Sequence, residues 1–138
     1  MELDYTAIHL ISLACVVLVI ILADYDGYRY LRGHVATLPM GRIVWLHRLT
    51  WVGLMAMIVS GIGLIGEKPS VVTEPAFIVK MFMVTALIIN GVAIGTLSRL
   101  ASSTPFAALT PRERAMLLIS GAISISCWLG AAFIGFVL

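Results

Sequence analysis

The sequence predicts an all-α integral membrane protein: a single domain, residues 1–138, folded as a four-helix bundle of up-down-up-down topology. The first reason is composition, because 61% of the residues are hydrophobic and only 12% are charged, whereas soluble domains are about half apolar and about a quarter charged. The second reason is that the charged residues are clustered and leave four long uncharged runs. Since one helical crossing takes about 20 residues, a chain of 138 residues has room for about four crossings with short connections.

The uncharged runs place the helices near residues 5–23, 43–66, 77–98 and 114–137. The second helix extends back to Ile43 if His47 and Arg48 lie at its end, and the third extends back to Phe77 if Lys80 is included. Transmembrane strands alternate polar and apolar residues, and residues 16–22 show no such alternation. Helices are therefore expected throughout.

Local signals mark the helix ends. Residues 110–113, Thr-Pro-Arg-Glu, are typical of a capping box with proline at the first helical position, which satisfies amides that lipid cannot. Glu74-Pro75 is a similar but weaker start for the third helix. The first helix is expected to remain in the mature protein, because Glu2 and Asp4 precede it rather than a basic stretch.

The basic residues predict the orientation in the membrane. Four crossings place both termini and the 67–76 loop on one side, and the 24–42 and 99–113 loops on the other. The two lysines fall on the first side and all the arginines on the second, namely Arg29, Arg32, Arg42, Arg48, Arg99, Arg112 and Arg114. The acidic residues divide into Glu2, Asp4, Glu67 and Glu74 on the first side and Asp24, Asp26 and Glu113 on the second.

The net charge of +2 thus resolves into +4 on the arginine side and −2 on the other. The positive-inside rule then predicts a multi-pass protein of the bacterial inner membrane with both termini periplasmic. The bilayer is the expected partner. Nucleic acid is not, because nine basic residues against seven acidic ones leave no basic surface.

Ionisable groups inside the spans are candidate functional residues, because they are costly in lipid. His9 lies about four residues into the first helix and Lys80 about four into the third, both from the outer side, which puts each about 6 Å below the interface. The two helices run parallel, so both groups are expected at the same depth. A hydrogen-bonded interhelical histidine and a lysine that extends to water are the alternative interpretations.

His47 lies at the opposite end of the second helix, about 15–20 Å from His9 along the membrane normal. One haem therefore cannot take both histidines of a single chain as axial ligands. Cys15 and Cys127 lie near mid-bilayer without a C-x-x-C motif, so free thiols are expected, although a cross-link is conceivable if the first and fourth helices touch.

Helical periodicity places several residues on one stripe of the third helix, namely Lys80, Met83, Leu87, Asn90 and Ile94, and Ser120, Ser124 and Trp128 on a stripe of the fourth. Asn90 needs an interhelical partner or a ligand at this depth. Both stripes could instead line a tight core. Gly91 and Gly95 form a small-xxx-small motif, which is more often a packing surface than a site. Residues 51–53, Trp-Val-Gly, are echoed by residues 128–130, Trp-Leu-Gly, as in two related hairpins.

Six short segments follow one another along the chain: Ile8-His9-Leu10, the acidic-aromatic turn Asp24 to Arg29, His47 to Gly53, Ser60 to Leu64, Phe77 to Lys80, and Asn90-Gly91. This order resembles small bacterial four-helix membrane proteins akin to the CopD copper-resistance family and, more distantly, the HemJ-type protoporphyrinogen oxidases. In the latter, a first-helix histidine and a third-helix lysine are the functional pair, associated with haem b and porphyrin. The resemblance implies these roles for His9 and Lys80. Residues 17–25 lack the W-x-A-G-L-F-Y-x-P-R-L signature of those enzymes, so the resemblance implies their scaffold rather than their specific activity.

We therefore expect a small membrane redox protein associated with haem (haem b, by the resemblance) or with a metal, whose site lies near the outer leaflet. His9 would be the axial or metal ligand or the proton carrier, and Lys80 the partner of a propionate or another anion. Met83 is a candidate for the second axial position, and Asn90 for a further contact with the cofactor. Whether the protein is an enzyme stays open.

Two other classes also stay open. One is a non-enzymatic structural or assembly subunit, either a homo-oligomer through Gly91 and Gly95 or part of a larger membrane complex. The other is a small transporter or channel, whose path would be lined by Asn90, Ser120 and Ser124.

Overall fold

The computed structural model describes residues 4–138, so Glu2 lies outside the described residues. It contains four long helices, α1 (Tyr5–Leu31), α2 (Met40–Glu67), α3 (Pro75–Ser103) and α4 (Pro111–Val137), and two 3₁₀ segments, η1 (Pro69–Thr73) and η2 (Phe106–Ala108). Residues 4–138 contain no strand. All four helices are long and apolar enough to cross a membrane. The prediction of an all-α chain of four such helices is confirmed.

The largest departure from the predicted bounds is at the end of α1, which continues eight residues beyond 23 to Leu31. The segment Asp24 to Arg29, expected as a turn, is helical, and its polar side chains interact with residues of α1 and α2. Arg42 Nε donates to Asp26 Oδ2 at 2.6 Å, and the Arg29 guanidinium lies 5.9 Å from the centre of the Tyr25 ring. Because α2 also begins three residues before the predicted 43, at Met40, the expected 24–42 loop is reduced to residues 32–39.

The capping box at the start of α4 is confirmed. The Glu113 amide donates to Thr110 Oγ1 at 3.2 Å, and the Thr110 amide donates to Glu113 Oε1 at 3.0 Å. At the start of α1, the Ala7 amide donates to the Asp4 carboxylate at 3.1 Å. Both caps satisfy amides that have no partner within the helix.

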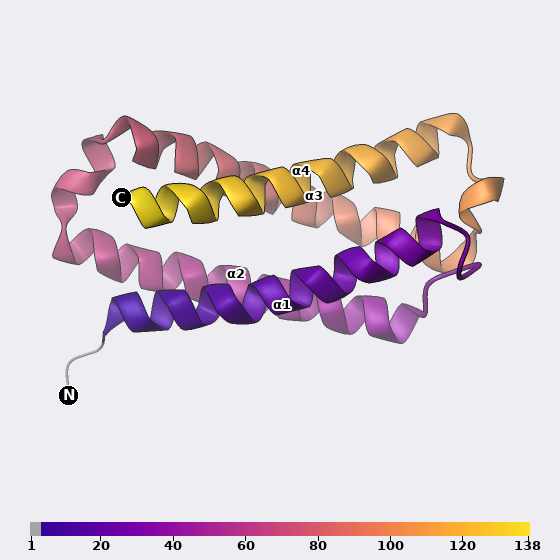
Figure 1. Cartoon of the computed structure of the whole chain (residues 1–138), viewed down its shortest axis with the longest axis horizontal. Helices are drawn as coiled ribbons and strands as arrows, with labels where there is room; N and C mark the ends of the chain where they lie inside the picture. The colour runs from indigo at the N-terminus through magenta and orange to yellow at the C-terminus, as the bar shows by residue number, and fades with distance from the viewer. Residues whose placement is uncertain (1–3) are drawn as a thin grey trace.

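The four helices form two hairpins, α1 with α2 and α3 with α4, and most contacts lie within a hairpin rather than between the two (Figure 1). A glycine allows close approach in each. A Cβ on Gly53 of α2 would lie 2.8 Å from Val16 Cγ2 of α1, and a Cβ on Gly130 of α4 would lie 2.7 Å from Met83 Sδ of α3. These are the glycines of the Trp-Val-Gly and Trp-Leu-Gly echo, so the echo marks equivalent packing points in the two hairpins.

The two ends of the bundle differ. Both termini and η1 lie at one end, which we name the termini end, and residues 32–39 and 104–110 lie at the other, which we name the arginine end (Figure 1). At the arginine end two hydrogen bonds join the hairpins. The Leu38 amide donates to the Ala101 carbonyl at 3.0 Å, and the Tyr30 hydroxyl donates to the Thr104 carbonyl at 2.6 Å. Midway along the bundle, side chains of all four helices form one buried cluster of Val16, Leu54, Leu87 and Trp128.

Candidate functional site

Two cavities lie between the hairpins, one on each side of the buried cluster. The first, which we name the His9 cavity, has a volume of about 460 Å³ and opens toward the termini end. Its lining is mostly apolar and comes from all four helices, and it includes both His9 and Lys80. The second, which we name the His47 cavity, has a volume of about 450 Å³ and lies toward the arginine end. Both volumes fall in the range of small-molecule sites, about 300–1,000 Å³.

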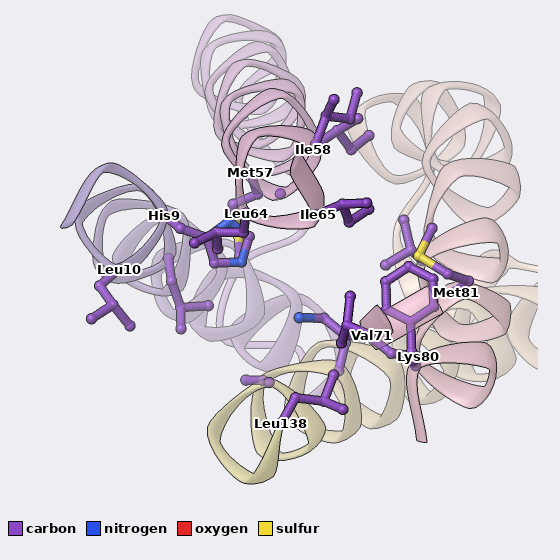
Figure 2. A pocket seen from close by; sticks show the side chains of 18 of the residues that line it. His9, Leu10, Met57, Ile58, Leu64, Ile65, Val71, Lys80, Met81 and Leu138 are labelled. Atoms are coloured by element: carbon purple, nitrogen blue, oxygen red, sulfur yellow. The ribbon is translucent and has the colours of Figure 1, made fainter. Parts of the chain in front are cut away.

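The two residues that the sequence places at one depth do meet in one cavity. The imidazole of His9, from α1, and the amine of Lys80, from α3, project into the same space from different hairpins (Figure 2). Both side chains are half-buried. Lys80 forms no salt bridge with any carboxylate of residues 4–138. The site therefore presents a cation and an imidazole inside an apolar lining.

Ser60 of α2 fixes the orientation of His9. Ser60 is 2% exposed, and its Oγ lies 2.8 Å from His9 Nδ1. The same hydroxyl donates to the Ala56 carbonyl at 2.8 Å and has the Met57 carbonyl at 3.2 Å. A serine hydroxyl has one proton and two lone pairs, so a hydroxyl that donates to the backbone accepts from the imidazole. This assigns the proton of neutral His9 to Nδ1, which leaves Nε2 with a free lone pair.

Glycines of the partner helices make room for both polar side chains. A Cβ on Gly61 of α2 would lie 3.6 Å from His9 Cε1, and a Cβ on Gly135 of α4 would lie 3.0 Å from Lys80 Nζ. Each ionisable side chain thus lies over a glycine of its own hairpin. Ser60, Gly61 and Gly135 were not singled out as site residues from the sequence. The signals for them in the sequence are the short Ser60 to Leu64 segment and a second small-xxx-small spacing in the fourth helix, from Ala131 to Gly135.

The other two predicted site residues lie elsewhere. Met83 is not among the lining of the His9 cavity, because its sulfur packs against Gly130 inside the second hairpin. Asn90 is 7% exposed and belongs to the His47 cavity. Its amide donates to the Ser120 carbonyl at 3.0 Å and accepts from the Ser120 hydroxyl at 2.8 Å. Asn90 has therefore found the interhelical partner that its depth requires.

His47 differs from His9 in which nitrogen is engaged. The Trp51 indole N–H donates to His47 Nε2 at 3.0 Å, and an indole nitrogen can only donate. Nε2 of His47 is therefore an acceptor, and the proton of the neutral ring lies on Nδ1. The two histidines line different cavities.

Residues 4–138 contain no group of three or more His, Cys, Asp or Glu side chains that could hold a metal ion. Cys15 is exposed and Cys127 half-buried, and both are free thiols.

No protein-family model, curated protein or solved structure matches this chain.

Proposed function

We propose that this chain is a small membrane redox protein that binds a haem-type macrocycle in the His9 cavity. The observation that carries the proposal is that His9 and Lys80, from different hairpins, line one apolar cavity in which His9 Nε2 has a free lone pair. A single imidazole is sufficient for a macrocycle that brings four nitrogen ligands of its own, whereas a bare metal ion would need further ligands, for which Met57 and Met81 are the candidates in this cavity. We favour the haem interpretation because it needs only this imidazole together with the amine of Lys80.

The chain's own residues would act as follows. His9 would hold the metal of the macrocycle through Nε2, and Ser60 would keep the ring in the tautomer that leaves this nitrogen free. A hydrogen bond to the second nitrogen of a ligating imidazole is the usual means of fixing its orientation. Lys80 offers its amine to a carboxylate of the macrocycle, and Gly135 leaves space for that amine. When bound, haem iron supplies one-electron chemistry.

Met57 and Met81 replace Met83 as the methionines nearest to such a group, because both line the His9 cavity. A thioether is a weak ligand for haem iron, so either sulfur would be a candidate for a second protein ligand. The double variant Met57→Leu/Met81→Leu separates them from an open position: a changed spin state in the absorption spectrum would assign a sulfur ligand.

We also propose the orientation. The arginine end carries all seven arginines and the termini end both lysines, which favours a bacterial inner membrane location with periplasmic termini and with the His9 cavity near the outer leaflet. Cysteine labelling at either end of intact cells tests this orientation.

The test of the cofactor is the absorption spectrum of the purified protein, with haemin added if it is purified without colour. We expect a Soret band that His9→Ala abolishes and that Lys80→Gln weakens. His34→Ala, in the 32–39 loop, is the matched control and should leave the band unchanged. Colourless protein that fails to bind haemin, or a band that survives His9→Ala, would refute the proposal.

The small residues of α3 bear on the alternative of an assembly subunit. Gly91, through which such a subunit could form an oligomer, faces Trp51 of the same chain, and a Cβ on Gly91 would lie 2.9 Å from Trp51 Cζ2. Gly95 likewise faces His47, at 4.0 Å. The small-residue motif of α3 therefore packs the two hairpins against each other within one chain.

A further inference from the structure

The His9 and His47 cavities are separated by a single layer of side chains. Leu54, Leu87 and Trp128 line both cavities, one from each of α2, α3 and α4. Their exposed fractions are 6%, 5% and 9%. We name these three residues the septum. Every other lining residue belongs to one cavity or the other.

The septum lies between two bodies that are each well packed. Contacts within the α1–α2 and α3–α4 hairpins far outnumber those between α2 and α3. Both cavities lie between the same two hairpins, so a small rotation of one hairpin against the other would widen one cavity and part the septum. Many secondary transporters alternate access by rocking one structural repeat against the other around a central site.

We propose that the two cavities are the halves of one route through the bundle for a small anion, and that the septum is its closed gate. Apolar constrictions close aqueous routes by excluding water, which is the property of a Leu-Leu-Trp layer. The inference goes beyond the haem proposal and applies to the haem-free protein, because bound haem would occupy the His9 cavity and engage Lys80.

The charges along the route favour an anion. Lys80 lies in the His9 cavity without a carboxylate partner among residues 4–138. In the His47 cavity, Asp26 is neutralised by Arg42 at 2.6 Å, and the imidazole of His47 offers its Nδ1–H. The arginine end, where this cavity lies, carries seven arginines against three acidic residues. Two lining carboxylates have no ion pair among the described residues, Asp24 in the His47 cavity and Glu67 in the His9 cavity, and both are exposed.

The experiment measures chloride entry into vesicles that contain the purified protein and a chloride-quenched dye, with no haem added. Trp128→Ala removes the largest side chain of the septum and should join the two cavities. We expect an initial chloride rate about tenfold above that of the wild type. Leu129→Ala is the matched control, because Leu129 is the next residue of α4 and is 68% exposed on the lipid-facing side. The control should behave as the wild type.

Two further arms make the result decisive. Lys80→Gln in the Trp128→Ala background should lower the chloride rate, and sodium entry measured in parallel should stay near that of protein-free vesicles. Leu87→Ala serves as the gate variant if Trp128→Ala does not elute as a folded, helical protein. Folded gate variants with the same chloride rate as Leu129→Ala would overturn the route. Sodium entry as fast as chloride entry would overturn the assignment to anions.

Discussion

Replacing Ser60 with alanine tests whether the Ser60 hydroxyl sets the chemistry of His9. The substitution removes the oxygen that lies 2.8 Å from Nδ1, at a position that is 2% exposed, so water has no ready access to replace it. A buried donor that loses its acceptor costs about 1–3 kcal/mol. His9 can avoid this cost by rotating or by moving its proton to Nε2, and either change removes the free lone pair from the cavity.

The expected result is a weaker axial bond in a protein that remains folded. Loss of the hydrogen bond behind a metal-bound histidine typically weakens binding by about 10–100-fold, which corresponds to about 1.4–2.8 kcal/mol. The cost of leaving the buried donor unpaired and the expected loss of binding free energy therefore agree in size. The assay is a haemin titration followed at the Soret band, with the spin state read from the same spectra.

The matched control is Ser124→Ala, a half-buried serine of α4 that lines the His47 cavity. It should bind haemin with wild-type affinity. If Ser60→Ala also binds with wild-type affinity while His9→Ala does not bind, the tautomer argument is wrong and Ser60 is only a packing residue. If neither Ser60→Ala nor His9→Ala changes binding, haemin does not bind at this site.

Two further predictions concern stability in detergent, measured by unfolding with a denaturing surfactant and followed by circular dichroism. Gly53→Ala places a Cβ 2.8 Å from the side chain of buried Val16, whereas the Cβ of Gly121→Ala meets nothing within 4 Å. Gly53→Ala should therefore be less stable than Gly121→Ala by about 1–3 kcal/mol, and the comparison cancels the gain in helix propensity that both variants share. Equal stabilities would contradict the close approach of α1 and α2. Asn90→Ala should lower the stability by about 0.6–1.7 kcal/mol, because it removes both hydrogen bonds to Ser120. If the bond to the Ser120 carbonyl dominates, Asn90→Ala should cost about the same in the Ser120→Ala background. If the bond between the two side chains dominates, Asn90→Ala should cost almost nothing in that background.

The helices could be predicted from the sequence because their signal is one-dimensional. Uncharged runs of sufficient length locate spans regardless of how helices pack, and Thr110 with Glu113 marks a helix start by local hydrogen bonds alone. The end of α1 was missed for the opposite reason. Its last two turns contain charged residues that end a hydropathy run, yet they stay helical because Asp26 pairs with Arg42 and Tyr30 bonds to Thr104, both distant in sequence.

The sequence could predict how far along each helix the site residues lie, but not in which direction around the helix axis they point. The number of residues from a helix end gives the depth of His9 and Lys80 directly. Which face of a helix turns inward is normally given by the contrast between polar and apolar sides, and helices that are apolar all round lack that contrast. Met83 and Lys80 fall on one predicted stripe, yet Lys80 reaches the His9 cavity while Met83 turns toward Gly130. Side chains three residues apart on a helix do not point in the same direction, so one can face the cavity while the other faces the neighbouring helix.

The positions of the glycines connect the internal echo to the site. In each hairpin one glycine brings the helices together at mid-bundle, Gly53 in the first and Gly130 in the second. In each hairpin a second glycine, nearer the termini end, lies under the ionisable side chain of the partner helix. Two hairpins of the same direction and the same scheme form a parallel repeat, and repeats of this kind place their sites where the two halves meet. Because His9 comes from one half and Lys80 from the other, neither hairpin alone contains the site, and a ligand that contacts both side chains would link the two halves.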